Sequence, residues 1–253
     1  MPEEIVVEFR DVSYVLPDGR EILHGLNLQV HGGEILVLLG RSGSGKTTAL
    51  KLVNRLLENT AGEICIEGRT SRDWDVIKLR RHIGYAIQEI GLFPHYTIAR
   101  NIGLVPTTEN WPKERIHARV RELMDLVGLN GDIASRYPHQ LSGGQRQRVG
   151  VARALAADPP ILLMDEPFGA LDPLTRTDLQ REFLSLQKKL GKTVLFVTHD
   201  LREAMLLGSR IALLEEGRLV TLNSPDEFLH SSDPLVAKYV EAFGTTSIER
   251  DCQ

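Results

Sequence analysis

The feature that most restricts the fold of this chain is a glycine-rich stretch directly after a run of apolar residues. A phosphate-binding pattern, G-x-x-x-x-G-K-[ST], is filled by Gly40, Gly45, Lys46 and Thr47. Its glycines allow successive backbone N–H groups to turn inward and form an anion-binding nest at a helix N-terminus. The apolar run before it, residues 35–39, and the helical pattern after it, residues 47–57, predict a strand, a loop and a helix. The alternative is a glycine-rich turn without a ligand.

The whole loop is predicted to hold the phosphates of a nucleotide. Its residues are Gly40, Arg41, Ser42, Gly43, Ser44, Gly45, Lys46, Thr47 and Thr48. In this interpretation Lys46 lies on the β- and γ-phosphates, and the Thr47 hydroxyl binds Mg²⁺.

A pair of carboxylates forms a second candidate site. Asp165 and Glu166 follow the apolar residues 161–164, at the end of a predicted strand. In P-loop NTPases a strand-end Asp holds Mg²⁺, and a neighbouring acid can deprotonate the attacking water. We therefore predict that Asp165 is the metal residue and Glu166 the general base. Taken alone, the pair would more often be a turn or a helix cap.

Hydrophobic patterning predicts an α/β fold. Residues 34–39, 161–164 and 193–197 are almost continuously apolar and run into polar or glycine-rich turns, which is typical of buried parallel strands. Residues 5–9 and 26–30 instead resemble antiparallel strands. We predict one domain over residues 1–222 with a mainly helical insertion at about 89–156. Residues 223–253 are predicted to form a short C-terminal helical tail, with no regulatory domain.

Composition excludes several classes of protein. The 253 residues carry 30 Lys and Arg against 34 Asp and Glu, and the net charge of −4 argues against a DNA-coating role, so we expect no nucleic-acid partner. No window approaches the ~18 consecutive apolar residues that span a bilayer. The acidic start without an apolar segment argues against a signal peptide. Two cysteines fit a reducing cytosol better than a disulfide framework.

Ordered motifs then give the chain a resemblance to ABC-type ATPases. After the phosphate-binding loop come Gln88, LSGGQ at residues 141–145, Asp165 with Glu166, ALD at residues 170–172 and THD at residues 198–200. The resemblance covers nearly the whole chain. It implies a P-loop NTPase (RecA-like) core with an antiparallel β-subdomain and the helical insertion. It also implies an ATPase that uses ATP and Mg²⁺.

The LSGGQ motif is interpreted from its residues and from the resemblance together. Ser142 before Gly143 and Gly144 predicts the N-cap of a helix, where a hydroxyl, amides and the helix dipole favour a phosphate. The resemblance implies a head-to-tail dimer, in which Ser142–Gln145 of one copy close on the γ-phosphate held by the other. It also implies that Asp172 lies at the dimer interface. The alternative is that the motif only caps a helix.

Three further roles come from the resemblance. Gln88 would contact Mg²⁺ and the lytic water, and His199 would hydrogen-bond the γ-phosphate and help to place that water. Tyr14 would stack on adenine, an interaction worth ~1–3 kcal/mol for a base on an aromatic ring. The alternatives are a structural strand-end histidine at position 199 and a half-buried strand tyrosine at position 14.

The resemblance also suggests which process the ATPase drives. A single ATPase domain with a compact helical insertion is similar to the subunits of importers, where two copies bind integral membrane permease subunits that an external solute-binding protein feeds. The segments at residues 83–106 and 150–160 resemble osmoprotectant (glycine betaine, choline, carnitine) uptake ATPases. Leu92 and Phe93 would contact the permease or pack in the insertion. Many relatives carry regulatory CBS modules, and their absence here puts regulation of that kind in doubt.

We therefore expect an ATPase at the cytoplasmic face of the membrane, acting with a second copy of itself and with permease subunits. The alternatives are an importer ATPase for another small polar solute and a non-transport ABC ATPase that acts on a soluble complex.

Overall fold

The computed structural model describes residues 4–87, 91–169 and 171–243, and the chain divides into two compact units. Unit 1 contains Met1–Trp74 and Thr193–Gln253, and unit 2 contains Asp75–Lys192. Each unit has one of the two tryptophans of the chain. The guanidinium of Arg69 lies 5.3 Å from the ring centroid of Trp74, and that of Arg115 lies 3.6 Å from that of Trp111.

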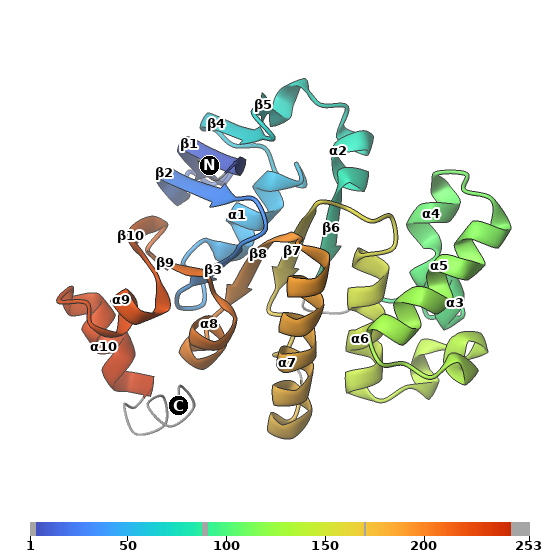
Figure 1. The fold of residues 1–253 in the computed structure, drawn as a ribbon. Helices are drawn as coiled ribbons and strands as arrows, with labels where there is room; N and C mark the ends of the chain where they lie inside the picture. Colours follow the sequence, from blue (N-terminus) through green and yellow to red (C-terminus); the bar gives the residue numbers. More distant parts are fainter. Residues whose placement is uncertain (1–3, 88–90, 170, 244–253) are drawn as a thin grey trace. The chain divides into compact units, whose positions relative to one another are not determined.

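The first sheet of unit 1 is antiparallel, with strand order β2-β1-β4-β5 (Figure 1). Its strands are β1 (Ile5–Val15), β2 (Glu21–His31), β4 (Ala61–Ile66) and β5 (Arg69–Thr70). The two predicted antiparallel strands correspond to parts of β1 and β2, which are both longer than expected. One face of this hairpin is buried, since Val7, Phe9 and Val12 are at most 1% exposed while Arg10 and Asp11 between them are exposed.

The second set of strands in unit 1 has the order β10-β9-β3-β8. The strands are β3 (Ile35–Leu39), β8 (Thr193–Thr198), β9 (Arg210–Glu215) and β10 (Arg218–Asn223). β3 is parallel to β8 and to β9, whereas β10 pairs antiparallel with β9. Every residue of β3 and β8 is buried, which explains their continuous apolar sequence.

The helices of unit 1 surround these strands. They are α1 (Lys46–Val53), the 3-10 helix η1 (Ser71–Asp73), α8 (Leu201–Leu207), α9 (Pro225–Leu229) and α10 (Pro234–Phe243). α1 contacts β2 and β4 of the antiparallel sheet and also β8, so it lies between the two sheets. The predicted end of this helix at residue 57 is wrong. Arg55 adopts a left-handed φ of 51°, and its guanidinium donates to the carbonyl oxygens of Ser71 and Trp74.

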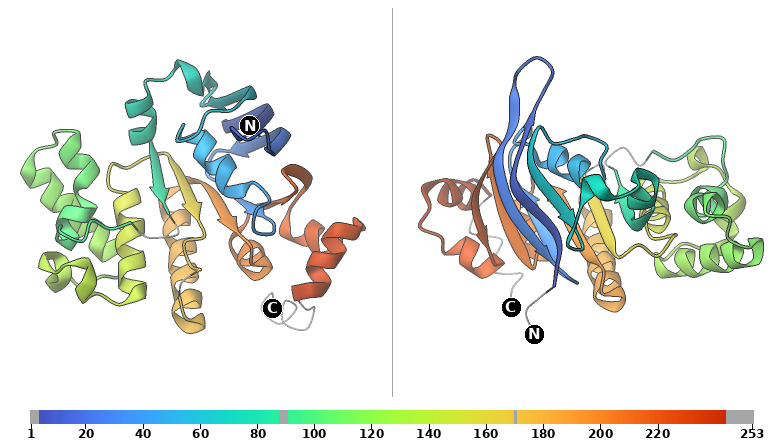
Figure 2. Two further views of the ribbon diagram at one scale, coloured as in Figure 1. Left: turned by 180° about the vertical axis from the view of Figure 1, so that it is seen from behind. Right: turned by 90° about the horizontal axis from the view of Figure 1, so that it is seen from above.

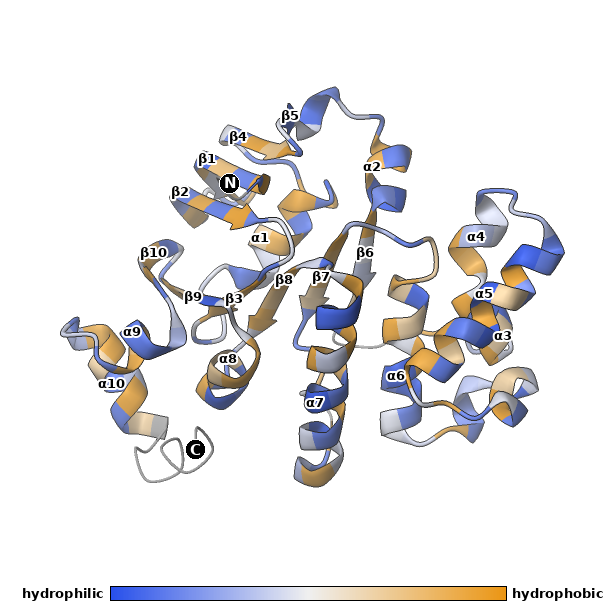
Figure 3. Ribbon diagram, viewed as in Figure 1, coloured by the Kyte–Doolittle hydropathy of each residue, from blue (hydrophilic) through white to orange (hydrophobic). Residues whose placement is uncertain are grey.

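Unit 2 combines two parallel strands with most of the helices. The strands β6 (Ile83–Ala86) and β7 (Ile161–Asp165) pair with Ile83 opposite Ile161. The α-helices are α2 (Val76–His82), α3 (Ile98–Ile102), α4 (Leu104–Thr108), α5 (Lys113–Leu126), α6 (Gly143–Ala154) and α7 (Pro173–Leu190), and the 3-10 helices are η2 (Gly131–Ser135) and η3 (Pro138–Gln140). α7 shows apolar and polar stripes along its length (Figure 3), and it ends at Gly191 in the left-handed conformation.

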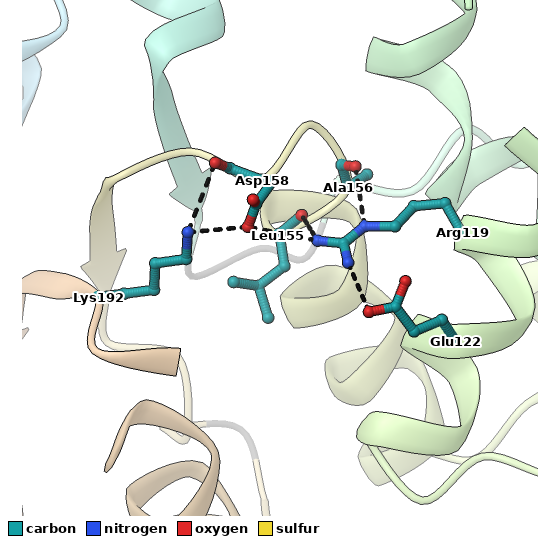
Figure 4. Close-up of polar contacts among 6 residues, drawn as sticks. All are labelled: Arg119, Glu122, Leu155, Ala156, Asp158 and Lys192. Atoms are coloured by element: carbon teal, nitrogen blue, oxygen red, sulfur yellow. Dashed lines mark hydrogen bonds and ion pairs between the residues drawn. The ribbon is translucent and has the colours of Figure 1, made fainter. Parts of the chain in front are cut away.

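An arginine of α5 joins three segments of unit 2 (Figure 4). Arg119 donates to the carbonyl oxygens of Leu155 (2.9 Å) and Ala156 (3.3 Å), which follow the last turn of α6. It also donates to Glu122 at 2.8 Å. Its Nη2 atom also lies 3.6 Å from the Asp158 carboxylate, which pairs with the Lys192 ammonium at 2.8 Å. These contacts hold the C-terminal end of α6 against α5.

The predicted α/β fold is therefore confirmed, and the described part of the predicted helical tail contains α9 and α10. The described residues between positions 91 and 156 form helices and turns, as an insertion would, although the domain boundaries themselves stay a prediction. In the described part of the chain, no helix has the length and apolar character that crossing a membrane requires. Figure 2 gives two further views of the same elements.

Candidate functional site

The phosphate-binding loop connects β3 to α1 in unit 1, as predicted. Gly43 and Gly45 have φ angles of 84° and 97°, a backbone conformation that favours glycine. Gly45 occupies the N-cap of α1, so the loop passes directly into the N-terminal turn of that helix. Backbone N–H groups at a helix N-terminus attract anions because they have no partners within the helix.

Lys46 is buried and folds back beneath this loop. Its ammonium donates to the carbonyl oxygens of Gly40 at 2.8 Å and Arg41 at 2.7 Å, and Ser44 Oγ lies 3.5 Å away. These contacts hold the positive charge of a 4% exposed residue within the loop. A buried cation held by neutral oxygens keeps a strong attraction for an anion.

The loop is enclosed by two neighbouring strands of unit 1. A Cβ atom placed on Gly40 would lie 2.3 Å from the carbonyl oxygen of Leu214 at the end of β9. A Cβ atom on Gly45 would lie 2.7 Å from the Leu23 side chain of β2. Only glycine fits at these two positions. The loop therefore has the close-packed backbone and the cationic side chain that a nucleotide phosphate needs.

The carboxylates Asp165 and Glu166 lie at the end of β7 in unit 2. Asp165 is 6% exposed, and the Tyr85 hydroxyl of the neighbouring strand β6 lies 3.5 Å from its Oδ2 atom. Burial, together with the charge of Asp165, raises the pKa of Tyr85. Tyr85 therefore keeps its proton and can donate it to Asp165. Glu166 has a left-handed φ of 45°, an uncommon conformation for a residue with a side chain.

The LSGGQ segment forms the start of α6, and the predicted N-cap is confirmed. Ser142 Oγ accepts from the Gln145 backbone N–H at 3.2 Å, and the Gln145 side chain accepts from the Ser142 N–H at 3.0 Å. A Cβ atom on Gly144 would lie 2.8 Å from the Thr175 methyl of α7, so this end of α6 packs closely on α7.

Asp172 begins the neighbouring helix α7. Its carboxylate accepts from the Thr175 backbone N–H at 3.1 Å. Hydrogen bonds from the side chain and backbone of Thr175 lower the pKa of Asp172. This residue therefore caps a helix, whereas its predicted place at a dimer interface stays a prediction.

The remaining predicted residues lie in different parts of the chain. His199 is exposed and follows the buried Thr198 at the end of β8. Tyr14 is half-buried in β1 opposite Leu23, the residue that packs on Gly45. Gln88 lies outside the described residues. Unit 1 thus carries the phosphate-binding loop, Tyr14 and His199, and unit 2 carries Asp165, Glu166, the LSGGQ segment and Asp172.

Two residues that contact or adjoin candidate residues, one in each unit, were not predicted from the sequence. Glu203 is 5% exposed and accepts from the Thr198 hydroxyl at 2.5 Å, while the Asp200 N–H donates to the same hydroxyl at 3.0 Å. These bonds constrain the turn that contains His199. Tyr85 beside Asp165 is the other such residue. The only sequence signal for either was a polar group close to a strand end.

The comparisons with known proteins fit this geometry. The sequence pattern of a family described as ABC transporter matches residues 23–169. This chain belongs to the ABC transporter family. Its phosphate-binding loop, LSGGQ segment, and Asp165 with Glu166 all lie in the matched range.

Curated members of the ABC transporter family are close in sequence. The choline transport ATP-binding protein OpuBA of Bacillus subtilis is 49% identical over 93% of this chain and 62% of its own length. The glycine betaine uptake system ATP-binding protein YehX of Escherichia coli is 51% identical over 87% of this chain and 71% of its own. The osmoprotectant import ATP-binding protein OsmV of Salmonella typhimurium is 55% identical over 81% and 54%. The chain thus spans less than two thirds of the length of OpuBA and of OsmV.

Solved ABC structures share the fold. A dimeric ATP-binding cassette in a post-hydrolysis state, bound to ADP and phosphate, is 34% identical with a TM-score of 0.79, over 87% of this chain and 98% of that one. The cbiO1 subunit of an ABC transporter complex from Clostridium perfringens is 26% identical with a TM-score of 0.82, over 93% and 94%.

Proposed function

We propose that this chain is an ATP-hydrolysing subunit that powers the import of an osmoprotectant or another quaternary amine. The observation that carries the proposal is the phosphate-binding loop, in which Lys46 is held by the carbonyl oxygens of Gly40 and Arg41. The similarity to a cassette solved with ADP and phosphate supports a nucleotide as its ligand.

We assign each part of ATP binding and hydrolysis to particular residues of the chain. The backbone of residues 40–48 binds the phosphates, and Lys46 neutralises charge on the β- and γ-phosphates. Tyr14 stacks on adenine, and its place opposite Leu23 supports this role because Leu23 touches Gly45. Glu166 takes a proton from the attacking water, and His199 orients that water.

The chain also offers oxygen ligands for a magnesium ion. Thr47, in the first turn of α1, offers a hydroxyl, and Asp165 offers a buried carboxylate that lies beside the Tyr85 hydroxyl. The hydroxyl of Thr47 and the carboxylate of Asp165 are oxygen ligands of the type that Mg²⁺ prefers. Mg²⁺ would be held by these residues with Gln88 and would offset the negative charge that develops on the transferred phosphoryl group.

Hydrolysis requires two copies in this proposal. The start of α6 presents a serine N-cap and glycine amides, and residues 142–145 of one copy complete the phosphate site formed by residues 40–48 of the other. Asp172 lies at the interface of that dimer. The dimeric cassette among the solved structures supports such an assembly.

The transport role rests on the relatives and on one surface. OpuBA, YehX and OsmV are named for the transport of choline, glycine betaine and osmoprotectants. Phe93 is 40% exposed, and buried Asn101 fixes its backbone by accepting from the Phe93 N–H at 2.8 Å and donating to its carbonyl oxygen at 3.1 Å. We assign Leu92 and Phe93 to a contact with permease subunits at the cytoplasmic face of the membrane. An external solute-binding protein would deliver the solute to that permease.

Two substitutions test the chemistry. Glu166→Gln is expected to lower ATP turnover by at least about 100-fold, keep ATP binding and trap a dimer, because the side chain retains its size and loses its basicity. The measurements are phosphate release and size-exclusion chromatography with ATP. Turnover near the wild-type rate would remove Glu166 from the role of base.

Lys46→Ala tests the loop itself. This variant is expected to lose ATP affinity, measured by equilibrium binding, because the cation beneath the loop is removed. Unchanged binding would contradict the assignment of the loop.

The transport role is tested by purification from gently solubilised native membranes. Recovery of a polytopic membrane protein in fixed ratio, with ATP turnover of the complex stimulated by glycine betaine or choline, would support it. Stimulation by a different solute would point to another importer. Recovery of soluble partners alone would leave the ATPase and overturn the import role.

A further inference from the structure

The phosphate-binding loop is connected to the last helix of unit 1 through one carboxylate. Glu215 ends β9, directly after Leu214, whose carbonyl oxygen encloses Gly40. Its Oε1 atom lies 4.0 Å from Nε of Arg41, the second residue of the loop. Its Oε2 atom accepts a hydrogen bond from the Tyr239 hydroxyl of α10 at 3.3 Å. One side chain thus faces both the loop and α10.

The Tyr239 hydroxyl is the donor in its hydrogen bond to Glu215. Burial, followed by the charge of Glu215, raises the pKa of Tyr239, so the hydroxyl keeps its proton at neutral pH. It can therefore donate to Glu215 and hold that carboxylate at the end of β9.

Helix α10, which carries the Tyr239 hydroxyl, is capped and packed within unit 1. The Asp233 carboxylate accepts from the backbone N–H groups of Leu235 and Val236 in the first turn of the helix. Val236 is fully buried and Tyr239 is 6% exposed, so the helix packs with its apolar side inward. It contacts α8 and α9, and all three helices belong to unit 1 (Figure 1).

The side chain of Arg41 contributes little to the connection between Glu215 and the loop. It is 72% exposed, and an ion pair at 4.0 Å in that setting contributes little. The restraint on the loop comes instead from the packing of Gly40 on Leu214, the residue next to Glu215. This contact acts on main-chain atoms, whose directions determine where the N–H groups of the loop point.

We propose that Tyr239 is a positioning residue for the phosphate-binding loop, so that docking of α10 and nucleotide binding stabilise each other. The proposal rests on the proposed function, because it concerns the loop that binds the nucleotide there. Since coupling between two equilibria is reciprocal, a bound nucleotide also holds α10 in place. Neither the LSGGQ segment nor the carboxylates of unit 2 take part.

The first experiment compares nucleotide affinity in two variants that each lose one phenolic hydroxyl. Tyr239→Phe is expected to weaken binding of a fluorescent ATP analogue about three- to tenfold, the effect of one hydrogen bond. The matched control is Tyr96→Phe in unit 2, where the ring stacks on the Arg100 guanidinium at 3.8 Å. It is expected to bind within twofold of the wild type. Thermal unfolding of each variant without nucleotide separates lost stability from lost affinity.

The second experiment uses only the wild-type chain. Hydrogen–deuterium exchange of the α10 amides is measured with and without the same ATP analogue, and the analogue is expected to slow exchange in α10. This measurement decides the question if Tyr239→Phe does not fold.

The outcomes separate this inference from the proposed function. Wild-type chain that does not bind the analogue would overturn both. Wild-type chain that binds it, with equal affinity in Tyr239→Phe and unchanged exchange in α10, would overturn the role of Tyr239 and leave the ATPase standing. A variant with a lower melting temperature and unchanged affinity would make Tyr239 a structural residue only.

Discussion

Replacing Arg119 by methionine removes the contact that holds the C-terminal end of α6 (Figure 4). The guanidinium donates to the carbonyl oxygens of Leu155 and Ala156, and its side chain is 15% exposed. These oxygens stand at a helix end, where carbonyl groups have no partner within the helix and carry the negative end of the helix dipole. Methionine keeps much of the apolar stem but offers no donor. The variant therefore removes the polar contacts of Arg119 and keeps most of its apolar packing.

The structure sets the size of the effect. A hydrogen bond that involves a charged group contributes about 1.5–3 kcal/mol, and the carbonyl oxygens regain part of this from water when the arginine is removed. The pair with Glu122, which is 60% exposed, adds less than about 1 kcal/mol. We expect Arg119→Met to lower the free energy of unfolding by about 2–3 kcal/mol. For a chain of this length the melting temperature then falls by roughly 5–10 °C.

The assay is urea and thermal unfolding of the variant beside Arg121→Met, which changes an exposed arginine of the same helix. Arg121→Met is expected to lie within about 0.5 kcal/mol of the wild type. If both variants unfold alike, the capping of α6 by Arg119 contributes nothing measurable and the reasoning is refuted.

Two further predictions follow from the site. Gly40→Ala places a Cβ atom 2.3 Å from the Leu214 carbonyl oxygen, so it should cost about 1–3 kcal/mol in unfolding experiments and weaken ATP binding. Gly131→Ala meets open space and is the control, and equal behaviour of the two variants would contradict the prediction. Asp172 has a lowered pKa in the folded chain, so the stability it supplies is present above its unfolded pKa of about 4 and is lost as the pH falls through its folded pKa. The melting temperatures of wild type and Asp172→Asn should therefore differ at pH 7 and converge as the pH falls below the lowered pKa of Asp172, whereas a constant difference would rule out the carboxylate cap.

The buried strands could be predicted because their short, continuously apolar sequences are typical of one kind of element. β3 and β8 are covered on both faces, and such strands are continuously apolar. Ser142 could be predicted as an N-cap for a similar reason, since a capping residue interacts with backbone only three positions away.

Two hairpins escaped prediction because their turns lack the usual signal. β4 and β5 are joined by Glu67 and Gly68, and β9 and β10 by Glu216 and Gly217. In both turns the glutamate and the glycine have positive φ, as two-residue hairpin loops of type I′ require. Asn or Asp usually precedes the glycine in turns of this type, so a glutamate at that position gives no sequence signal for the turn.

The parts of the site that depend on neighbouring strands could not be predicted either. The contact between Tyr85 and Asp165 requires β6 to pair with β7, and these residues are 80 positions apart in the sequence. The left-handed backbone of Glu166 carries no signal, because glutamate rarely adopts it. The same holds for Tyr239, which reaches Glu215 beside the phosphate-binding loop only through the fold of unit 1.

Because each unit contains one tryptophan, intrinsic tryptophan fluorescence can report on each unit separately. In a Trp111→Phe variant the remaining tryptophan is Trp74, which fluoresces from the unit that carries the phosphate-binding loop. The backbone carbonyl oxygen of Trp74 accepts a hydrogen bond from Arg55, just past α1. A Trp74→Phe variant instead confines emission to the unit with the LSGGQ helix. Titrating nucleotide against each single-indole protein during heating would therefore show which unit the ligand protects first, without any attached dye.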